Sequence, residues 1–458
     1  MNATFTTAEV DAVIKAYDVR GLVGEQIDAD FVHQVGQSFA RLMRAEGASS
    51  VVIGHDMRDS SPELSAAFAT GVTAQGLDVV RIGLASTDQL YFASGELDMP
   101  GAMFTASHNP AAYNGIKLCR TGAKPVGQDT GLRTIAAEIV AGVPAHDGPA
   151  GTATDRDVLG DYGAFLRGLV DLSGIRRLTV AVDAGNGMGG HTVPAVLAGL
   201  PLEIDPLYFE LDGDFPNHEA NPLDPANIVD LQQRVRETGA DIGLAFDGDA
   251  DRCFVVDERG EPVSPSAVTA LVAERELARR PGATIIHNLI TSRVVPELVA
   301  EHGGTAVRTR VGHSFIKQAM AETGAVFGGE HSAHYYFADF WGADSGMLAA
   351  MHVLAALGEQ DRPLSELMAD YQRYAASGEI NSTVDDQQGR TEAAVAAFAD
   401  RAVSVDRLDG VTVDLGAGSW FNLRASNTEP LLRLNVEAPT AAEVERLSAE
   451  VLSVVRGA

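Results

Sequence analysis

Short apolar runs, each followed by a glycine-bearing turn and an amphipathic stretch, recur along much of the chain. Each such unit is typical of a buried strand, a tight turn, a helix and a second strand. The runs that open the units are residues 51–54, 178–182 and 284–286, and the third continues with an expected helix over residues 291–302. The recurrence predicts an α/β architecture built from similar modules.

The pattern changes near the C-terminus, where strands are expected at residues 411–415, 420–423 and 431–436 and a helix at 441–455. In that helix the apolar residues repeat at helical spacing and share one face, which predicts a small closing α+β domain. Boundaries are expected in the Gly/Pro/Ala-rich stretch of residues 142–154, near residue 256 and near residue 369. The predicted domains are residues 1–152, 153–256, 257–369 and 370–458.

Composition limits the partners of this chain. At 458 residues it is long enough for three or four domains, and 45% hydrophobic with 21% charged residues is typical of a globular protein. A net charge of −29 argues against nucleic acid or an anionic membrane as partner, so an anionic substrate would need a local positive pocket. Two cysteines, no leader and no apolar run long enough to span a bilayer indicate a reduced, cytoplasmic compartment.

The segment 247–252, Asp-Gly-Asp-Ala-Asp-Arg, places three carboxylates at alternate positions. Oxygen ligands so spaced suit one hard cation, and Mg²⁺ fits best because it keeps coordination sites for water or phosphate. An EF-hand calcium loop is the competing interpretation. It needs glycine where this chain has Arg252, and helices where residues 240–246 and 253–256 have the pattern of strands.

The segment 105–110, Thr-Ala-Ser-His-Asn-Pro, follows a strand-like run and exposes Ser107 in a turn. Alone it is typical of a turn or helix cap, but beside an aspartate loop it indicates a serine that carries phosphate. Lys117 is a candidate general acid or base, because a buried lysine near cations loses its proton readily. His108 is the other candidate, with an orienting hydrogen bond as its alternative role.

Four further segments each have a functional and a plain interpretation. Residues 424–430 could cradle a phosphate or form a simple turn, and residues 330–334 could hold sugar hydroxyls or form a hydrogen-bonded loop. Residues 17–21 could be a capped turn or bring an arginine to phosphate. The glycines of residues 185–190 match a dinucleotide-binding pattern, with Glu203 or Asp205 for the ribose, but serve any tight strand-to-helix turn equally well.

With the serine turn of residues 105–110, the aspartate loop of residues 247–252, the segment 329–334 and the loop 424–428 in this order, the chain resembles the α-D-phosphohexomutase family, and most closely its bacterial phosphomannomutase/phosphoglucomutase branch. The resemblance implies an α/β fold of four domains around a central cleft. Three would share a mixed α/β sheet-and-helix topology, and a smaller α+β domain would close the chain. The segment Glu330-His331-Ser332-Ala333-His334 favours this branch over the phosphoglucosamine mutases, which remain an alternative.

The resemblance also implies roles for individual residues. Ser107 would be the phosphoserine; Asp247, Asp249 and Asp251 would hold Mg²⁺ together with a Ser107 phosphate oxygen. Lys117 and His108 would transfer protons, with Arg252 close to the phosphate. Residues expected to bind substrate are Tyr17, Arg20, Arg293, His313, Glu330, Ser332, His334, Arg424, Ser426, Asn427, Thr428 and Arg433.

Among these, Glu330 and Ser332 would bind sugar hydroxyls, and Arg424, Ser426, Asn427 and Thr428 would bind the phosphate that is not transferred. The chain departs from many relatives at Ile290, where they have a substrate-contacting lysine. Arg293, His313 or Lys317 could compensate.

The implied reaction interconverts hexose 6-phosphate and hexose 1-phosphate, of mannose and of glucose, through a hexose 1,6-bisphosphate that also serves as activator. The partners would be hexose phosphates, with no nucleic acid and no membrane, and the oligomeric state is left open. A Mg²⁺-dependent sugar phosphatase and a noncatalytic sugar-phosphate-binding protein are the rival classes. Binding alone does not require the whole serine, lysine and aspartate set.

Overall fold

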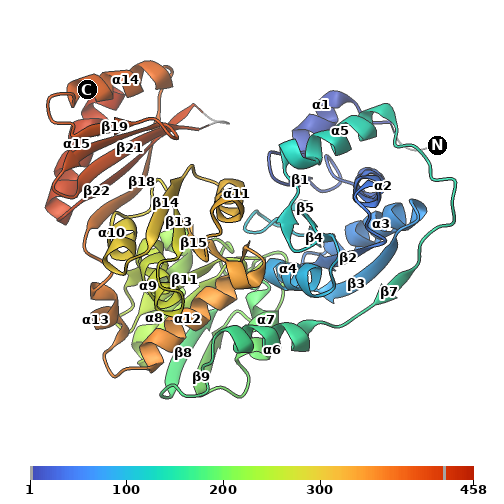
Figure 1. Ribbon diagram of the computed structural model, residues 1–458, viewed down its shortest axis with the longest axis horizontal. Helices are drawn as coiled ribbons and strands as arrows, with labels where there is room; N and C mark the ends of the chain where they lie inside the picture. The colour runs from blue at the N-terminus through green and yellow to red at the C-terminus, as the bar shows by residue number, and fades with distance from the viewer. Residues whose placement is uncertain (1–3, 427–429, 458) are drawn as a thin grey trace. The chain divides into compact units, whose positions relative to one another are not determined.

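The computed structural model describes residues 4–426 and 430–457 (Figure 1). The chain divides into two compact units. Unit 1 holds residues 1–263 and 333–365, and unit 2 holds residues 264–332 and 366–458. The chain therefore leaves unit 1, returns to it for a short segment, and leaves again.

The first sheet of unit 1 has the strand order β1-β5-β4-β2-β3-β7, with β6 paired to β5. Its strands are β1 (Val19–Leu22), β2 (Ser50–His55), β3 (Asp78–Leu84), β4 (Gly101–Phe104), β5 (Tyr113–Arg120), β6 (Lys124–Pro125) and β7 (Ala153–Asp155). Its helices are α1 (Thr7–Val13), α2 (Ala29–Ala45), α3 (Ser61–Ala74), α4 (Thr87–Glu96) and α5 (Leu132–Ala141). Helices α1, α2, α3 and α5 share one apolar core with the sheet.

The second sheet has the order β12-β11-β10-β8-β9. Its strands are β8 (Leu178–Asp183), β9 (Leu202–Leu207), β10 (Ile242–Phe246), β11 (Cys253–Asp257) and β12 (Pro262–Val263), and its helices are α6 (Leu159–Leu169), α7 (Gly189–Leu197) and α8 (Val229–Thr238). In both sheets three parallel strands are followed by an antiparallel fourth, with corresponding orders β5-β4-β2-β3 and β11-β10-β8-β9. The predicted repeat of one topology is confirmed for these two modules.

Unit 2 begins with the same arrangement, since β13 (Thr284–Asn288) lies parallel to β14 (Thr305–Thr309) on one side and to β15 (Phe327–Gly329) on the other. Its helices are α9 (Pro265–Arg279), α10 (Val294–Glu301) and α11 (His313–Thr323). Helix α10 starts three residues later than the sequence predicts, because Thr291 and Ser292 lie in the turn before it. Thr291 Oγ1 donates to Asn288 Oδ1 at 2.8 Å, and Ser292 Oγ accepts from Val294 N at 3.2 Å.

The segment that returns to unit 1 contains β16 (Tyr335–Phe337), β17 (Ala343–Asp344) and α12 (Gly346–Gly358), and α13 (Leu364–Ala369) follows it. The buried carboxylate of Asp88 holds this returning segment in unit 1. It accepts hydrogen bonds from Tyr162 and Ser345 at 2.7 Å each and from Ser86. Ser345 is also the N-cap of α12 and accepts from Leu348 N. One buried charge thus joins helices α4, α6 and α12.

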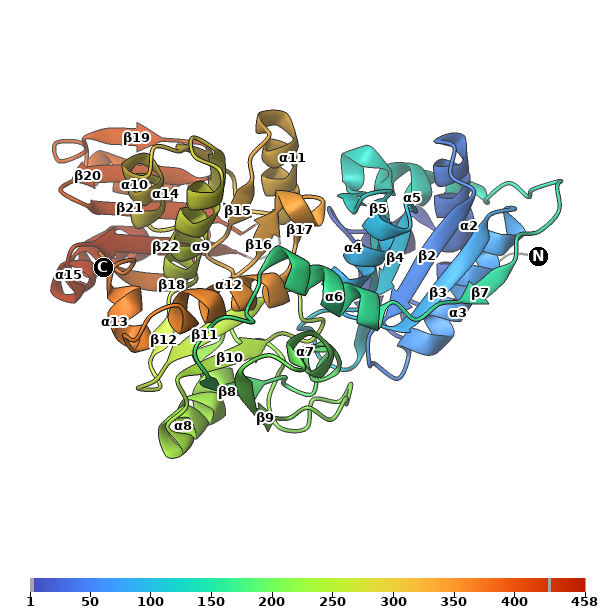
Figure 2. The same ribbon diagram turned by 60° about the horizontal axis from the view of Figure 1, so that its bottom comes forward.

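The C-terminal domain is the predicted antiparallel sheet with a helix, ordered β18-β22-β21-β20-β19. Its strands are β18 (Ala375–Thr383), β19 (Ser404–Asp406), β20 (Val411–Gly416), β21 (Ser419–Ala425) and β22 (Leu431–Ala438), and its helices are α14 (Gln387–Ala397) and α15 (Ala441–Arg456). Figure 2 shows both helices beside this sheet. One apolar face of α15 enters the core of the domain, as its helical spacing predicts.

Two sheets extend slightly past the domain edges expected from the sequence. Strand β7, just after residue 152, pairs with β3 of the first sheet, and β12, after residue 256, pairs with β11 of the second. Composition marks where turns gather, but it does not show which edge a short strand joins. Within the described ranges, no helix is long and apolar enough to cross a membrane.

Replacing Tyr162 by phenylalanine removes one of the hydroxyl donors of Asp88. We expect a loss of about 1.5–3 kcal/mol in the stability of unit 1, the usual value of a hydrogen bond to a charged group. The chain has two tryptophans. In a Trp420→Phe background, fluorescence of Trp341 during urea unfolding therefore follows unit 1.

The matched control is Tyr208→Phe, whose hydroxyl donates at the same 2.7 Å to the solvent-exposed Asp230. Its effect should stay within about 0.5 kcal/mol. Equal effects of the two variants would show that the buried Asp88 is not a special anchor.

Candidate active site

Ser107 stands in a tight turn directly after β4. Its φ of 50° is left-handed, and its backbone N–H donates to Thr105 Oγ1 at 2.9 Å, which fixes the turn. Its Oγ donates to Asp247 Oδ2 at 3.0 Å. The side chain is almost fully buried, so the serine is held against a carboxylate of the second module rather than in open solvent.

The three aspartates lie in the turn between β10 and β11, the two strands that the sequence predicts around them. Asp247, Asp249 and Asp251 are at most 1% exposed, and one carboxylate oxygen from each lies within 4.8 Å of the other two. One oxygen each of Asp249 and Asp251 is buried without a hydrogen-bond partner. Such orphaned carboxylate oxygens suit a hard cation, so these residues could hold a metal ion.

Glycine at position 248 lets the serine turn approach the aspartate loop. A Cβ there would lie 2.4 Å from the backbone oxygen of Ser107. On the other side, a Cβ at Gly187 would lie 2.7 Å from the oxygen of Gly248. The glycines of residues 185–190 therefore serve close backbone packing, and Asp205, the candidate ribose ligand, is paired with Arg234 at 2.5 Å.

Two cations balance the three carboxylates. Lys117 Nζ donates to Asp249 Oδ2 and Asp251 Oδ2, each at 2.6 Å, and Arg252 Nε donates to Asp247 Oδ2 at 2.9 Å. Burial raises the pKa of Asp247 to about 7, although Arg252 opposes the shift. Burial also raises the pKa of Asp249, but Lys117 outweighs it and holds that pKa well below its usual range.

The pKa of Lys117 is shifted in the direction opposite to the one expected from the sequence. Burial lowers its pKa, but Asp249 and Asp251 outweigh burial and hold the pKa well above the usual value. The expectation that this lysine readily loses its proton is wrong for the structure, because its nearest neighbours are carboxylates rather than cations. Lys117 is an ammonium ion here.

His108 is held in the opposite protonation state. Burial, together with Arg252 and Arg20, lowers its pKa to about 3, so the ring is neutral. Arg252 Nη2 lies 2.7 Å from His108 Nδ1, and since arginine can only donate, Nδ1 is the acceptor. Ser107 Oγ lies 3.3 Å from the same nitrogen.

Arg20 lies on β1, and Tyr17 precedes that strand. Arg20 donates to Asn109 Oδ1 and to Asp18 Oδ2 at 2.6 Å each, so it contacts the serine turn as expected of a residue near phosphate. Tyr17 is 37% exposed.

The expected sugar-binding segment divides between the two units. His334 lies in unit 1, where its Nδ1 is 2.9 Å from Asp344 Oδ2 and 3.9 Å from Asp251 Oδ1. Burial lowers the pKa of His334, but Asp251 and Asp344 outweigh it and raise the pKa. In unit 2, Glu330 is buried and accepts from Asn288 Nδ2 at 3.2 Å, and Ser332 follows it.

Arg424 and Arg433 are neighbours on β21 and β22. Arg424 thus belongs to a strand, and the loop begins at Ser426, two residues later than predicted. Glu379 pairs with both arginines at 3.8 and 3.6 Å, and among the described residues the Nε atom of each arginine is buried without a hydrogen-bond partner. This excess of positive charge suits an anion. Asn427 and Thr428 lie outside the described residues.

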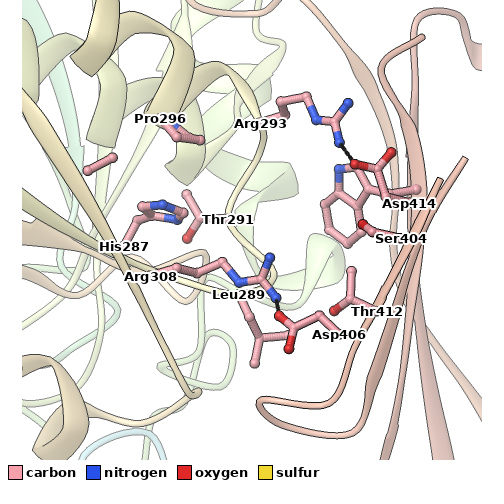
Figure 3. Close-up of a pocket in the computed structure, with 12 residues that line it drawn as sticks. His287, Leu289, Thr291, Arg293, Pro296, Arg308, Ser404, Asp406, Thr412 and Asp414 are labelled. Atoms are coloured by element: carbon pink, nitrogen blue, oxygen red, sulfur yellow. Dashed lines mark hydrogen bonds and ion pairs between the residues drawn. The ribbon is translucent and has the colours of Figure 1, made fainter. Parts of the chain in front are cut away.

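Arg293 lines a cavity of about 370 Å³ between the third module and the C-terminal sheet (Figure 3). Its Nη2 donates to Asp414 Oδ2 at 2.6 Å, and Arg308 pairs with Asp406 across the same cavity. The ion pair of Arg293 thus joins the third module to the C-terminal sheet. His313 begins α11, and Lys317, one turn on, is largely buried.

Sequence reasoning missed three residues of this site. Arg58 donates to the serine turn, Thr87 Oγ1 donates to Asp249 Oδ2 at 2.6 Å, and Asp344 orients His334. Thr87 and Asp344 carry no sequence signal, because their partners lie far away in the chain. Arg58 follows a buried strand in an Asp-x-Arg pattern, which could have been noted.

Four family models cover most of the chain, with descriptions that read phosphoglucomutase/phosphomannomutase alpha/beta/alpha domain I (residues 11–142), domain II (162–260), domain III (264–374) and C-terminal domain (379–454). The chain belongs to this family. It is a hexose phosphate mutase. The family's third domain spans both compact units, because the chain returns to unit 1 at residue 333.

Individual relatives agree with this membership. The chain is 39% identical to phosphohexose mutases of Xanthomonas campestris over 97% of its own length and 99% of theirs. It is 39% identical to the phosphomannomutase of Salmonella typhimurium, over 93% of this chain and 94% of that protein. A phosphoglucomutase/phosphomannomutase family protein of Burkholderia thailandensis has a solved structure that matches with a TM-score of 0.88 and 33% identity, over 97% and 98% of the two chains.

A divalent cation that binds the three aspartates should stabilise this mutase. We expect saturating Mg²⁺ to raise the midpoint of thermal unfolding, since a ligand that binds only the folded state shifts the equilibrium. Asp249→Asn and Asp251→Asn should each abolish the increase. Asp257→Asn, at the end of β11 in the same module, is the control and should keep it. An increase of equal size in all variants would place the cation elsewhere.

Proposed function

We propose that this mutase interconverts the 6-phosphates and 1-phosphates of mannose and glucose, with Ser107 as the residue that carries the phosphoryl group. The contact that supports the proposal is the 3.0 Å hydrogen bond from Ser107 Oγ to Asp247, one of three buried carboxylates. A phosphate on this oxygen would stand beside the candidate cation site and next to Arg252. Both would offset its charge of about −2.

Asp247, Asp249 and Asp251, with an oxygen of phospho-Ser107, would hold Mg²⁺. The bound ion would supply electrostatic stabilisation of the charge on the transferred group, which is the main source of catalysis in phosphoryl transfer. Arg252 would contribute in the same way as a fixed guanidinium.

The reaction transfers one phosphoryl group in each direction. The bond between Ser107 Oγ and phosphorus breaks as a sugar hydroxyl forms a bond to the same phosphorus, and neutral His108 accepts the hydroxyl proton. Lys117 could accept that proton only after passing its own to a neighbouring carboxylate. The resulting hexose 1,6-bisphosphate turns over, and its other phosphoryl group returns to Ser107 with the proton delivered to the departing sugar oxygen. A trace of bisphosphate would also phosphorylate idle enzyme, so it acts as an activator.

The sugar and the distant phosphate would be bound by the remaining predicted residues. Glu330, Ser332 and His334 would contact sugar hydroxyls. Arg424, Arg433 and Ser426, with Asn427 and Thr428, would bind the phosphate that is not transferred, and Arg20 and Tyr17 would act near the serine. At position 290, where isoleucine replaces a lysine, Arg293, His313 or Lys317 could compensate. With hexose phosphates as its partners, the enzyme would act in the cytoplasm.

Replacing Ser107 by alanine should abolish mutase turnover. The assay follows mannose 1-phosphate and glucose 1-phosphate by phosphorus NMR, with Mg²⁺ and catalytic glucose 1,6-bisphosphate. We expect both sugars to yield 6-phosphates without free inorganic phosphate, and the variant to lose at least about 10³-fold in kcat, as for other nucleophile deletions. Ser65→Ala, another buried serine of the first module, is the control. Release of inorganic phosphate would instead identify a phosphatase.

Replacing Arg424 by alanine should weaken substrate binding. Loss of a charge-assisted contact to phosphate corresponds to roughly tenfold or more in KM for hexose 1-phosphate. Arg407→Ala is the matched control in the same domain, because that arginine is exposed and already paired with Glu392 at 2.7 and 2.8 Å. Steady-state kinetics with equal KM for both variants would argue against the phosphate cradle.

A further inference from the structure

Arg58 is almost completely buried, at 1% exposure, in the connection from β2 to α3. Its guanidinium donates to four backbone oxygens of one loop. Nη2 donates to Ser107 O at 2.9 Å and Asn109 O at 2.6 Å, and Nη1 donates to Pro110 O at 2.9 Å and Tyr113 O at 3.0 Å. One side chain therefore donates hydrogen bonds to four backbone carbonyl oxygens of the loop that carries Ser107.

The arginine is itself held from several sides. Its Nε lies 3.3 Å from Asp56 Oδ2, and Asp56 Oδ1 accepts from the backbone N–H of Arg58 at 3.1 Å and from Ser61 Oγ at 2.6 Å. The ring of Phe215, from the second module, lies 5.2 Å below the guanidinium carbon. A Cβ at Gly213 would lie 2.8 Å from Arg58 Cα. The loop that contains Gly213 and Phe215 therefore packs directly on the arginine.

These contacts connect Arg58 to the position of Ser107 Oγ. The serine turn follows β4 and begins with Ser107 in a left-handed conformation. The direction of the Ser107 side chain therefore depends on the backbone conformation of the residues that follow. Carbonyl oxygens that converge would repel one another without a donor between them. The planar fork of arginine reaches all four oxygens at once, whereas a lysine ammonium has only three donors at one point.

We propose that Arg58 is a positioning residue for phosphoryl transfer: it fixes the backbone of residues 107–113 so that Ser107 Oγ, with or without its phosphate, faces Asp247 and the aspartate loop. This inference rests on the proposed role of Ser107. Arg58 itself touches the backbone of the turn rather than the reacting oxygen.

The test compares Arg58→Lys and Arg58→Gln with wild type in steady-state and single-turnover assays of hexose phosphate conversion. A small misplacement of the reacting oxygen costs about 10²-fold in rate. We therefore expect kcat to fall by about 10²-fold while KM stays within about twofold, because the sugar-binding residues are unchanged. Amide hydrogen exchange should increase in residues 107–113 and remain unchanged in the C-terminal domain.

Arg167→Lys is the matched control, since Arg167 Nη1 also donates to two backbone oxygens, of Ala195 at 3.0 Å and Val196 at 2.8 Å, at the end of α7. Its kcat should stay at the wild-type value. Unchanged kcat in both Arg58 variants would overturn the inference, as would global unfolding of both, because Arg58 would then be only a folding residue.

A Ser107→Ala variant measured beside them separates the two proposals. If it keeps full activity, the phosphoserine assignment has failed. If it is inactive while the Arg58 variants are fully active, only the positioning role has failed.

Discussion

Burying three carboxylates side by side is the constraint on which this candidate active site depends. Each would lose much of its hydration at 0–1% exposure, and their mutual repulsion adds to that cost. The structure offsets the charge with Lys117, Arg252 and hydroxyl donors from Thr87 and Ser107. Two carboxylate oxygens remain without protein donors, and a cation fits there.

The charge balance also explains why the first two modules share the site. The second module supplies the aspartates on a tight turn between β10 and β11, and the first supplies the lysine on β5, the threonine at the start of α4 and the serine after β4. Gly248 allows the serine and aspartate turns to meet backbone to backbone. The segment after residue 333 returns to the same unit and places His334 near Asp251. Neither module holds a complete site by itself.

Periodicity and motif chemistry predicted much of this arrangement. The repeated apolar strands and turns indicated the shared topology, and the alternating aspartates between two strands indicated the cation site. Ser107 could be singled out once the aspartate loop was recognised. Local pattern could not reveal partners distant in sequence, because a hydrogen bond such as that between Thr87 and Asp249 spans 162 residues.

The sequence could not predict protonation states, nor which sheet a short edge strand joins. Lys117 was expected beside cations and stands between two carboxylates, so its pKa moves in the opposite direction. Strand β7 joins the first sheet across a boundary that composition alone would place before it. Arg293, expected to bind substrate, also pairs with Asp414 of the C-terminal sheet, a contact that the sequence does not show. In each case the deciding neighbour comes from a remote part of the chain.

The central claim is that phosphate on Ser107 and a cation on the three aspartates occupy adjacent places. Phosphorus NMR of the phosphorylated enzyme, titrated with paramagnetic Mn²⁺, tests it most directly. The account predicts that the phosphoserine resonance broadens strongly at equimolar Mn²⁺ and that excess Mg²⁺ restores it. A phosphoserine resonance that stays sharp with Mn²⁺ bound would contradict the account, because the ion and the phosphate would then lie apart.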